Sequence, residues 1–310
     1  MTNSLTLPNV SLPLPVARKV VGPLFRVMLH SRLPWSVQRA AIEAASVLQA
    51  VPARTEVHKL RLGGRPAERV CAAGATGTGA VMYLHGGGYT VGSPITHRSL
   101  AGLLAHEIGC PIYVPDYRLA PEHPYPAALD DAEAVFLDLV ATGVAPDRIA
   151  VSGDSAGGGL ALALAQRLRD RHAMAPAALG LIAPWTDPNE IPDRERDLVV
   201  STPWSRNCAA AYLGAGDPLD PGYAPLLGEL TGLPRTYVQV DSGELLYTQC
   251  ERLVAALREA RVPVSFSVTD GLWHVSQLQA SIVAPAAAAA RELAEFITTA
   301  LSAGQAAETG

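Results

Sequence analysis

The sequence predicts an α/β protein in which a mostly parallel central sheet is flanked by helices and covered by a helical cap. Three observations predict this fold. Short apolar runs alternate with helical patterns, two segments interrupt that alternation, and 310 residues of which 49% are hydrophobic can bury a full core. Strands that alternate with helices form βαβ units, and such units build parallel sheets.

Eight β-rich runs are expected to form one sheet in two halves. Each run is short, rich in apolar or β-branched residues and bounded by turn formers. In chain order they are residues 56–62, 69–73, 80–84, 112–115, 149–152, 178–182, 236–240 and 264–268. Helical patterns cover residues 95–108, 127–141, 155–171, 245–260 and about 285–301, with further ones near 17–30, 35–47 and 204–213.

Two segments do not fit the alternation of strands and helices. Residues 1–50 contain helical patterns but no strand, and residues 186–230 are inserted between two strands and end in a Pro- and Gly-rich return. An insertion of this kind usually forms a lid, and a helical pair without strands must pack against something. We therefore expect 1–50 and 186–230 to form a cap over an α/β core made of 51–185 and 231–310.

Charge and hydropathy exclude several classes of protein. The net charge of -5 gives no basic field for nucleic acid. Arg18, Lys19, Arg26 and several prolines interrupt the N-terminal apolar stretch, so no membrane-spanning run exists, and a signal-peptide pattern is also missing. We expect a cytoplasmic protein. An amphipathic helix at a membrane surface is the alternative for residues 14–30, against which its thin cationic face argues.

The cysteines do not indicate a metal or redox site. Cys71, Cys110, Cys208 and Cys250 are spread along the chain without a C-x-x-C pair. This spacing fits neither a zinc site nor a redox dithiol, and buried free thiols in a reducing compartment are expected. We predict a protein that needs no metal and no cofactor.

A candidate nucleophile follows the strand at 149–152. The chain reads G-D-S-A-G at 153–157 and continues into a helix, which is the context of a G-x-S-x-G nucleophile elbow. Its glycines allow close packing of a neighbouring strand and helix, and Ser155 lies at a helix N-terminus that favours an anionic intermediate. Phosphate binding is the alternative for such a turn. Against it, the phosphate-binding glycine motifs are absent and Asp154 would repel an anion.

A candidate oxyanion hole follows the strand at 80–84, where the chain reads H-G-G-G-Y from residue 85. Successive glycines expose backbone N–H groups that no side chain screens, as the stabilisation of an oxyanion requires. The candidates are Gly86, Gly87 and Gly88, together with the Ala156 N–H beside the nucleophile. A flexible turn is the alternative for the glycines alone.

A nucleophilic serine needs a base, and the base needs an orienting carboxylate. His274 lies in the loop after the last predicted strand, where the order serine, acid, histidine places the base. The acid should follow the penultimate strand, where both Asp241 and Glu244 qualify, while Asp270 is too near His274 in sequence. We prefer Glu244 over Asp241. For either carboxylate, capping of the following helix is the alternative role.

These residues resemble those of a hormone-sensitive-lipase-type esterase of the α/β-hydrolase fold, the bacterial family IV type. Beside the two glycine motifs, the resemblance rests on D-Y-R-L-A-P-E-H-P-Y-P-A-A at 116–128, followed by Asp130 and Asp131. This long run is far more specific than either glycine motif. The resemblance covers about residues 75–280 and implies a cap over the active site. It also implies oxyanion donors at Gly87, Gly88 and Ala156.

The sequence departs from the family pattern in two places. Many members carry the acid in D-P-L-R-D, whereas this chain reads D-S-G-E-L-L at 241–246. Matching the leucines aligns Glu244 with the usual aspartate, and glutamate can do the same work with one more methylene. The family histidine is often followed by Gly-Phe, whereas His274 is followed by Val-Ser, which alters the pocket wall but not the triad.

The expected function is that of a serine carboxylesterase which acts through an acyl-enzyme. The resemblance implies a small-molecule ester with a short to medium acyl chain as substrate. The candidate pocket walls are the aromatic side chains of Tyr89, Trp185, Trp204, Tyr212 and Trp273, for which plain packing is the alternative. A homodimer is possible because the last strand of this fold is often exposed and pairs subunits.

Two other readings stay open. The same triad serves lactonases, arylacetamide deacetylases, thioesterases and peptidases, which fold and triad alone cannot separate. A hydrolase-like binding protein without catalysis is the second alternative. Such relatives usually lose the base, and the presence of His274 in register argues against it.

Overall fold

The computed structural model describes residues 12–308 apart from residues 48, 78, 191 and 193. Its centre is one eight-stranded sheet. The strand order is β1 (Thr55–Leu62), β2 (Arg65–Ala72), β4 (Ile112–Pro115), β3 (Ala80–Leu84), β5 (Ile149–Asp154), β6 (Ala178–Ile182), β7 (Thr236–Asp241) and β8 (Val264–Thr269). The pairs β1–β2 and β2–β4 are antiparallel, and all other neighbours are parallel. The mostly parallel α/β fold is confirmed.

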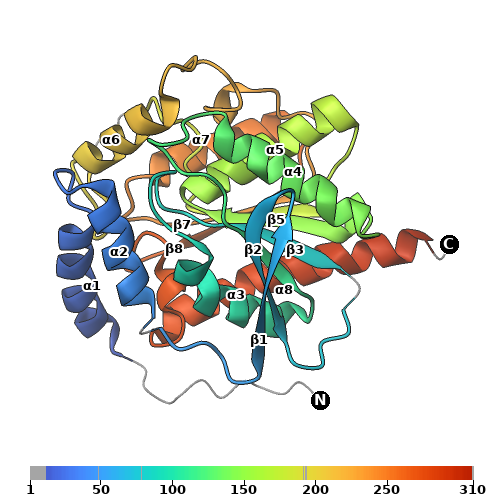
Figure 1. Ribbon diagram of the computed structural model, residues 1–310, viewed down its shortest axis with the longest axis horizontal. Coiled ribbons are helices and arrows are strands. Elements are labelled where there is room, and N and C mark those ends of the chain that lie inside the picture. Colours follow the sequence, from blue (N-terminus) through green and yellow to red (C-terminus); the bar gives the residue numbers. More distant parts are fainter. Residues whose placement is uncertain (1–11, 48, 78, 191, 193, 309–310) are drawn as a thin grey trace.

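Helices cover both faces of the sheet (Figure 1). Figure 1 shows α4 (Ala127–Ala141), α5 (Ala156–His172) and α7 (Tyr247–Glu259) above the sheet, and α3 (Pro94–Ile108) and α8 (Ala284–Glu308) below it. Three short 3₁₀ helices join these elements: η1 (Pro146–Arg148), η2 (Pro225–Leu227) and η3 (Ser276–Gln279). Because both faces are covered, β3, β5, β6 and β7 are buried along their whole length, as parallel strands require.

Local sequence explains where several elements begin and end. Helix α3 begins after Ser93, whose backbone N–H donates to the Thr96 hydroxyl at 3.0 Å, with Pro94 in the first turn, and Gly109 ends it in the left-handed region. Strand β2 begins at Arg65, earlier than the apolar run at 69–73 predicts, because its first half is polar and lies in an edge hairpin. Helix α8 continues beyond the predicted end near residue 301.

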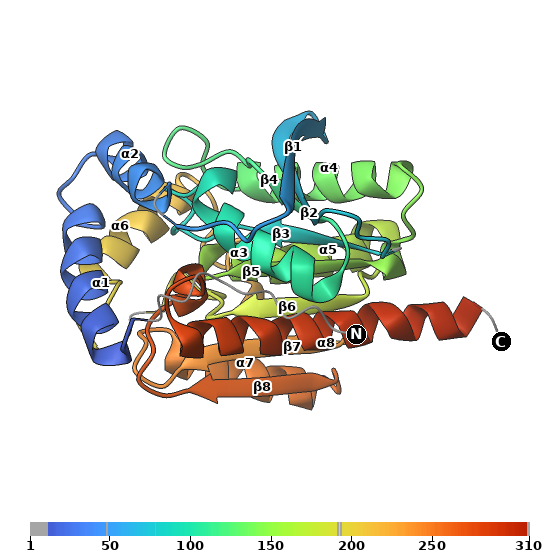
Figure 2. The same cartoon turned by 90° about the horizontal axis from the view of Figure 1, so that it is seen from below.

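Helices α1 (Leu14–Met28), α2 (Trp35–Ser46) and α6 (Thr202–Leu213) lie together at one end of the sheet, and we call them the helical layer (Figure 2). The Trp204 Nε1–H donates to the Gln38 side-chain oxygen at 2.8 Å and joins α6 to α2. The Asn207 amide donates to the Ser31 carbonyl at 2.9 Å. Residues from the N-terminal and inserted segments thus pack against each other.

Arg18 ties helix α1 to the loop after β8. Its Nη1 donates to the carbonyl oxygens of Gly271 and Leu272 at 2.5 and 2.8 Å. A long-range contact is thereby made between the first helix and the last loop before α8. Within the described residues, no helix is long and apolar enough to cross a membrane.

Candidate active site

Ser155 lies at a sharp turn between β5 and α5. Its φ of 51° and ψ of -120° are strained for a residue with a side chain, and such strain clusters at functional sites. A Cβ on Gly153 would lie 2.5 Å from the Gly157 carbonyl oxygen, and one on Gly157 would collide with the Leu84 carbonyl. The two glycines are therefore required by close approach of β3 and α5, as the sequence predicts.

The structure brings Ser155, His274 and Glu244 together from three separate loops. The His274 Nε2 lies 2.9 Å from the Ser155 Oγ, and its Nδ1 lies 2.5 Å from a Glu244 carboxylate oxygen. Because a carboxylate can accept but not donate, the Nδ1 carries the proton and the Nε2 is left to accept from the serine hydroxyl. All three side chains are buried.

Asp241 and Glu244 make different contacts although they are close in sequence. Asp241 does not contact the base: one carboxylate oxygen accepts from the Gly243 N–H, and the other accepts from the Thr269 hydroxyl and the Leu272 N–H. The second oxygen of Glu244 accepts from the Asp241 N–H at 2.9 Å. The geometry therefore places Glu244 on the base, while Asp241 joins the end of β7 to the loop that carries the base.

The surroundings of the base and the acid raise the pKa of both groups. Burial by itself would lower the pKa of His274, but the Glu244 charge and hydrogen bond outweigh it and raise this pKa above its ordinary 6.5. Burial raises the pKa of Glu244, against the lowering effect of His274. Asp197, from the inserted segment, accepts from the Leu245 N–H at 3.0 Å and adds to the rise of the His274 pKa.

The glycine loop after β3 supplies fewer candidate donors than the sequence predicts. The Gly86 N–H donates to a carboxylate oxygen of Asp154 at 3.0 Å, so it already has a protein acceptor and is a weaker oxyanion donor than its neighbours. For Gly87, Gly88 and Ala156, no protein acceptor among the described residues takes the backbone N–H. These three donors remain for a developing negative charge near Ser155.

Asp154 is a functional residue that the sequence reasoning used only to exclude phosphate. It is buried, and the same oxygen that binds Gly86 also accepts from the Tyr83 hydroxyl and lies 3.0 Å from the His97 Nε2. Burial alone would raise the pKa of Asp154, but His97 and the hydrogen bonds lower it. A buried anion thus fixes the glycine loop to the nucleophile elbow. The sequence feature that could have indicated this role of Asp154 is its position next to Ser155 inside the G-x-S-x-G motif.

The long D-Y-R-L-A-P-E-H-P run supports the glycine loop. The Tyr117 ring stacks on His85, with ring centroids 4.2 Å apart, and its hydroxyl donates to the His85 carbonyl at 2.6 Å. Burial lowers the pKa of His85 to about 3, so this imidazole is neutral. Arg118 pairs with the buried Asp131 at 2.8 Å and holds the run against α4.

Arg39 joins the helical layer to the same run. From α2, its guanidinium donates to the carbonyl oxygens of Thr90 and Ala120, both at 2.8 Å, and pairs with Glu122 at 2.7 Å. The family motif therefore positions both the glycine loop and the helix above it.

Two cavities meet at Ser155 and His274. The larger has a volume of about 750 Å³ including its solvent-filled mouth, and it extends under α1 and α2. Its apolar walls include Phe25, Met28, Leu29, Ile42, Ala45 and Val200. The smaller has a volume of about 300 Å³ and lies beside Trp185 and Leu245.

The five aromatic candidates for pocket walls separate into two groups. Trp185 and Trp204 line the cavities. Tyr89, Tyr212 and Trp273 do not line either of these two cavities, so their expected role as pocket walls stays a prediction. The rings of Tyr89 and Tyr212 stack on each other with centroids 3.6 Å apart, and Trp273 donates to Gln279 in the interior. These contacts are those expected of aromatic side chains that pack in the interior.

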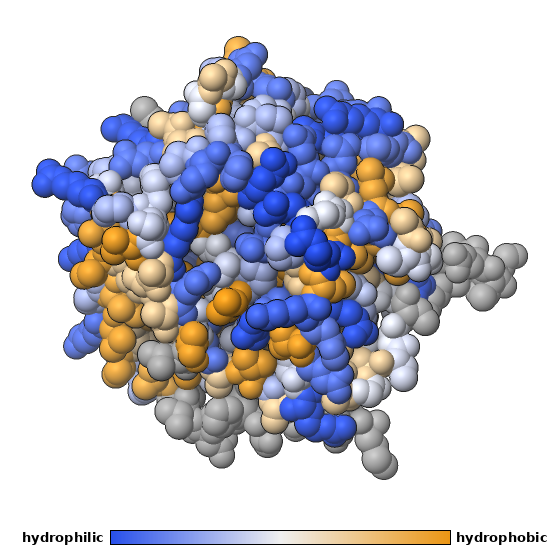
Figure 3. Space-filling view, viewed as in Figure 1, coloured by the Kyte–Doolittle hydropathy of each residue, from blue (hydrophilic) through white to orange (hydrophobic). Residues whose placement is uncertain are grey.

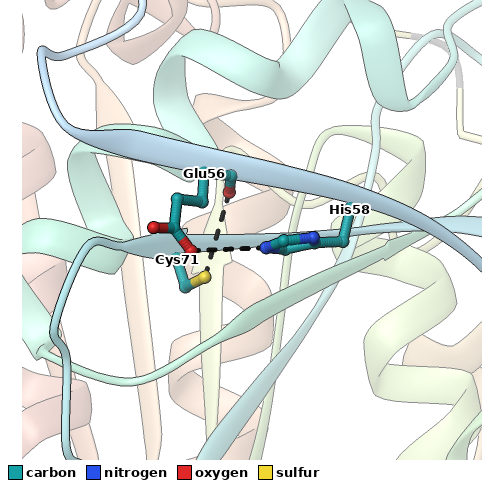
Figure 4. Close-up of side chains that lie close together, drawn as sticks. All are labelled: Glu56, His58 and Cys71. Carbon is teal, nitrogen blue, oxygen red and sulfur yellow. Dashed lines mark hydrogen bonds and ion pairs between the residues drawn. The ribbon is translucent and has the colours of Figure 1, made fainter.

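A group of possible metal ligands lies on the β1–β2 hairpin, away from Ser155 (Figure 4). The ligand atoms of Glu56, His58 and Cys71 lie within 4.8 Å of one another, and all three residue types bind zinc. The Arg69 guanidinium lies 3.6 Å from the Cys71 sulfur, so a positive charge already contacts it. We assign no metal to this group. The sequence signal was the i, i+2 spacing of Glu56 and His58 on one strand face.

A family model of the α/β hydrolase fold matches residues 81–278, which include the glycine loop, Ser155, Glu244 and His274. The chain therefore belongs to the α/β-hydrolase family. Two solved structures are similar at TM-scores of 0.88 and 0.87. The first is an esterase of the bacterial hormone-sensitive lipase family, which is 33% identical and covers 92% of this chain and 98% of its own. The second is a hormone-sensitive lipase from a metagenome library, which is 30% identical and covers 94% of this chain and 100% of its own. The resemblance to the hormone-sensitive lipase type is confirmed.

Curated relatives carry the names of ester-cleaving enzymes. The putative acetyl-hydrolase LipR of Mycobacterium tuberculosis is 34% identical over 90% of this chain and 92% of its own length. An acetyl-hydrolase of Streptomyces hygroscopicus is 39% identical over 63% and 67%. An ethyl acetate hydrolase of Pseudomonas putida is 35% identical over 72% and 73%.

Proposed function

We propose that this protein is a serine carboxylesterase that hydrolyses esters with short to medium acyl chains. Its reaction class is the hydrolysis of carboxylic esters, which the family and the names of the relatives share. The observation that carries the proposal is the hydrogen-bonded chain from Glu244 through His274 to Ser155 where two cavities meet. No other function has a specific observation in its favour.

The proposed reaction proceeds through an acyl-enzyme. The Ser155 Oγ attacks the ester carbonyl carbon while its proton passes to the His274 Nε2. The tetrahedral intermediate then expels the alcohol, which takes that proton from the Nε2. Water attacks the acyl-serine with the same base, and the carboxylic acid leaves. Glu244 keeps the proton of His274 on the Nδ1 and stabilises the imidazolium in both halves of the reaction.

The proposed oxyanion hole consists of the N–H groups of Gly87, Gly88 and Ala156. Ala156 is the first residue of α5, so the positive end of the helix dipole adds to its N–H. Asp154 holds the preceding Gly86 peptide and thereby sets the direction of the next two. Donors that are fixed before the reaction stabilise the oxyanion without the cost of reorganisation.

We propose that residues 1–50 and 186–230 act as a cap over the α/β core and select the substrate. The contacts between the two segments and the position of α1 and α2 over the larger cavity support this role. The acyl chain then lies in the larger, mostly apolar cavity and the alcohol in the smaller one. Ser46 and Gln49 add polar groups to the larger wall, which disfavours long acyl chains.

We also propose a cytoplasmic location and a homodimer. The described cysteines are free and buried, as is usual in a reducing compartment. Strand β8 is an edge of the sheet and exposes Val268, which is typical of a strand that pairs with a second copy.

The experiment is hydrolysis of p-nitrophenyl esters from acetate to palmitate by the wild type and by Ser155→Ala. Turnover that depends on Ser155 and peaks at short or middle chains is expected. The control is Ser152→Ala, because Ser152 is a buried serine on β5, the strand that leads to Ser155, and its hydroxyl donates to the Gly180 carbonyl. Equal turnover in wild type and Ser155→Ala would overturn the proposal. If no ester is cleaved but a phosphonate probe labels Ser155, the nucleophile is active and the substrate assignment is wrong.

A further inference from the structure

The outer face of helix α1 carries an exposed apolar stripe. Val16, Val20, Leu24 and Val27 recur at helical spacing and are between 45% and 67% exposed. Figure 3 shows hydrophobic side chains gathered on the side of the molecule where Figure 1 draws α1. A surface helix of a globular protein normally turns polar residues to solvent. Contiguous apolar surface of this kind indicates an interaction site.

The stripe cannot be buried by rotation of α1, because the inner face is already used. A Cβ on Gly22 would lie 2.8 Å from the Leu198 side chain, so the helix packs closely on the inserted segment there. Phe25 and Met28 line the larger cavity. Arg18 is bonded to the loop after β8. Helix α1 is thus apolar on two sides, and one of them remains in solvent.

The charged side chains on α1 itself have one sign: Arg18, Lys19 and Arg26 are basic, and the helix contains no acidic residue. Residues 1–42 contain five basic residues and no acidic one, although the whole chain has a net charge of -5. Lys19 and Arg26 are exposed on α1 and, by helical spacing, follow one border of the stripe. An apolar stripe bordered by cations complements an anionic lipid surface, where apolar groups enter the interface and cations meet the head groups.

We propose that α1 docks the enzyme on an anionic lipid surface and that its substrates are esters dissolved in that surface. This inference rests on the proposed esterase function and names the source of its substrate. The larger cavity lies directly behind α1, since Phe25, Met28 and Leu29 form part of its wall. Docking through the outer face therefore brings the cavity to within one helix thickness of the lipid.

The test is flotation of the full-length protein with vesicles of phosphatidylcholine that contain or lack about 30% phosphatidylglycerol. The wild type is expected to bind the anionic vesicles at least about tenfold more tightly. Val20→Glu/Leu24→Glu should weaken this binding more than about tenfold, and Lys19→Gln/Arg26→Gln about tenfold. The matched control is Leu219→Glu/Leu227→Glu, which changes two exposed apolar side chains elsewhere and should bind like the wild type.

Hydrolysis of p-nitrophenyl butyrate in solution separates this inference from the function on which it rests. None of the substituted α1 side chains lines a cavity, so all variants should hydrolyse this ester like the wild type, which also shows that they fold. A wild type without esterase activity overturns the function itself. An active wild type that does not bind anionic vesicles overturns the docking. Variants of the α1 stripe that still bind vesicles but no longer form a dimer in sedimentation also overturn the docking proposal, because the stripe then contacts a second copy of the chain and not a lipid surface.

Discussion

The two sides of the substrate cavity are built in different ways. On the sheet side, the nucleophile, base, acid and glycine loop are each held by hydrogen bonds to buried polar groups, of which Asp154 and Asp241 bind several partners each. On the opposite side, α1 and α2 present mostly apolar side chains to the same cavity. Directional bonds fix atoms within a narrow range, whereas apolar contacts tolerate changes of shape.

This difference separates chemistry from selection. Substitutions on the sheet side should lower turnover for every ester by large factors, because they remove groups that act in the transition state. Substitutions in the helical layer should change the preferred ester by small factors and leave the chemistry intact. The predictions below test that contrast.

Loss of the nucleophile or the base should have the largest effect. Ser155→Ala and His274→Ala should each lower kcat with p-nitrophenyl butyrate by at least about 10⁴-fold, and the double variant should lose little more, because triad members act as a unit. Steady-state kinetics measure this. Additive losses in the double variant would contradict a shared mechanism.

Replacement of the acid should follow in size. Glu244→Gln should lower kcat by about 10³-fold or more, since it removes the charge that orients and stabilises the base. Asp241→Asn should keep most of the activity but lower the free energy of unfolding by about 1–3 kcal/mol, because buried N–H and hydroxyl donors lose their charged acceptor. Kinetics and urea unfolding of both variants measure the contrast. The reverse ranking in kcat would move the acid role to Asp241.

Neutralising the buried anion below the glycine loop should have an intermediate effect. Asp154→Asn should lower kcat about 10- to 100-fold with little change in KM, because the Gly86 peptide is no longer held and the next two N–H groups lose their alignment. The control is Asp147→Asn, which removes a carboxylate in η1 before the same strand. An Asp154→Asn variant that changes KM but not kcat would mean that Asp154 positions substrate instead.

The acid limb of the pH profile should reflect the raised pKa of His274. The imidazole must be neutral to act as a base, so kcat/KM should fall about tenfold per pH unit below an apparent pKa above 6.5. Because Glu244 raises this pKa, the residual activity of Glu244→Gln should have its acid limb at lower pH. A shift of that limb to higher pH would show that Glu244 does not interact with the base as a carboxylate.

Substitutions in the helical layer should have the smallest effect. Ile42→Phe fills part of the larger cavity and should shift the preferred acyl chain to shorter esters by a few-fold in kcat/KM. Activity on a series of alkyl acetates, which vary the alcohol, should change less. Val37→Phe at an exposed position of α2 is the control. A change confined to the alkyl acetate series would place the alcohol in the larger cavity.

Much of the fold and of the catalytic side was predictable from sequence because local patterns encode both. The alternation of apolar runs and helical patterns predicted the strands within a few residues, except where β2 begins with polar residues at an edge. The elbow, the glycine loop and His274 follow strands, so their chain order predicted that they meet at one edge of the sheet. Geometry was needed to separate Glu244 from Asp241, since Asp241 is the last residue of β7 and Glu244 lies only three residues further along the chain.

The helical layer and the support of the glycine loop were less predictable because they depend on long-range contacts. The Gly86 N–H was expected to be free, but its partner Asp154 lies on another strand. Similarly, Tyr89 and Tyr212 are far apart in sequence and were expected to line a pocket, but they stack on each other. A sequence pattern can indicate that a side chain is aromatic and inside, but not which neighbour occupies the space beside it.

The two hydrogen bonds of Arg18 connect helix α1 to the loop that carries His274. They hold the carbonyl oxygens of Gly271 and Leu272, in the loop that carries His274, so the order of this loop and the position of α1 on the core are thermodynamically linked. This linkage is reciprocal. An interaction that stabilises the packing of α1 on the core also stabilises the loop that carries His274, and a ligand that orders this loop stabilises the packing of α1 by the same free energy. Arg18 therefore couples the position of helix α1 to the order of the loop that carries His274.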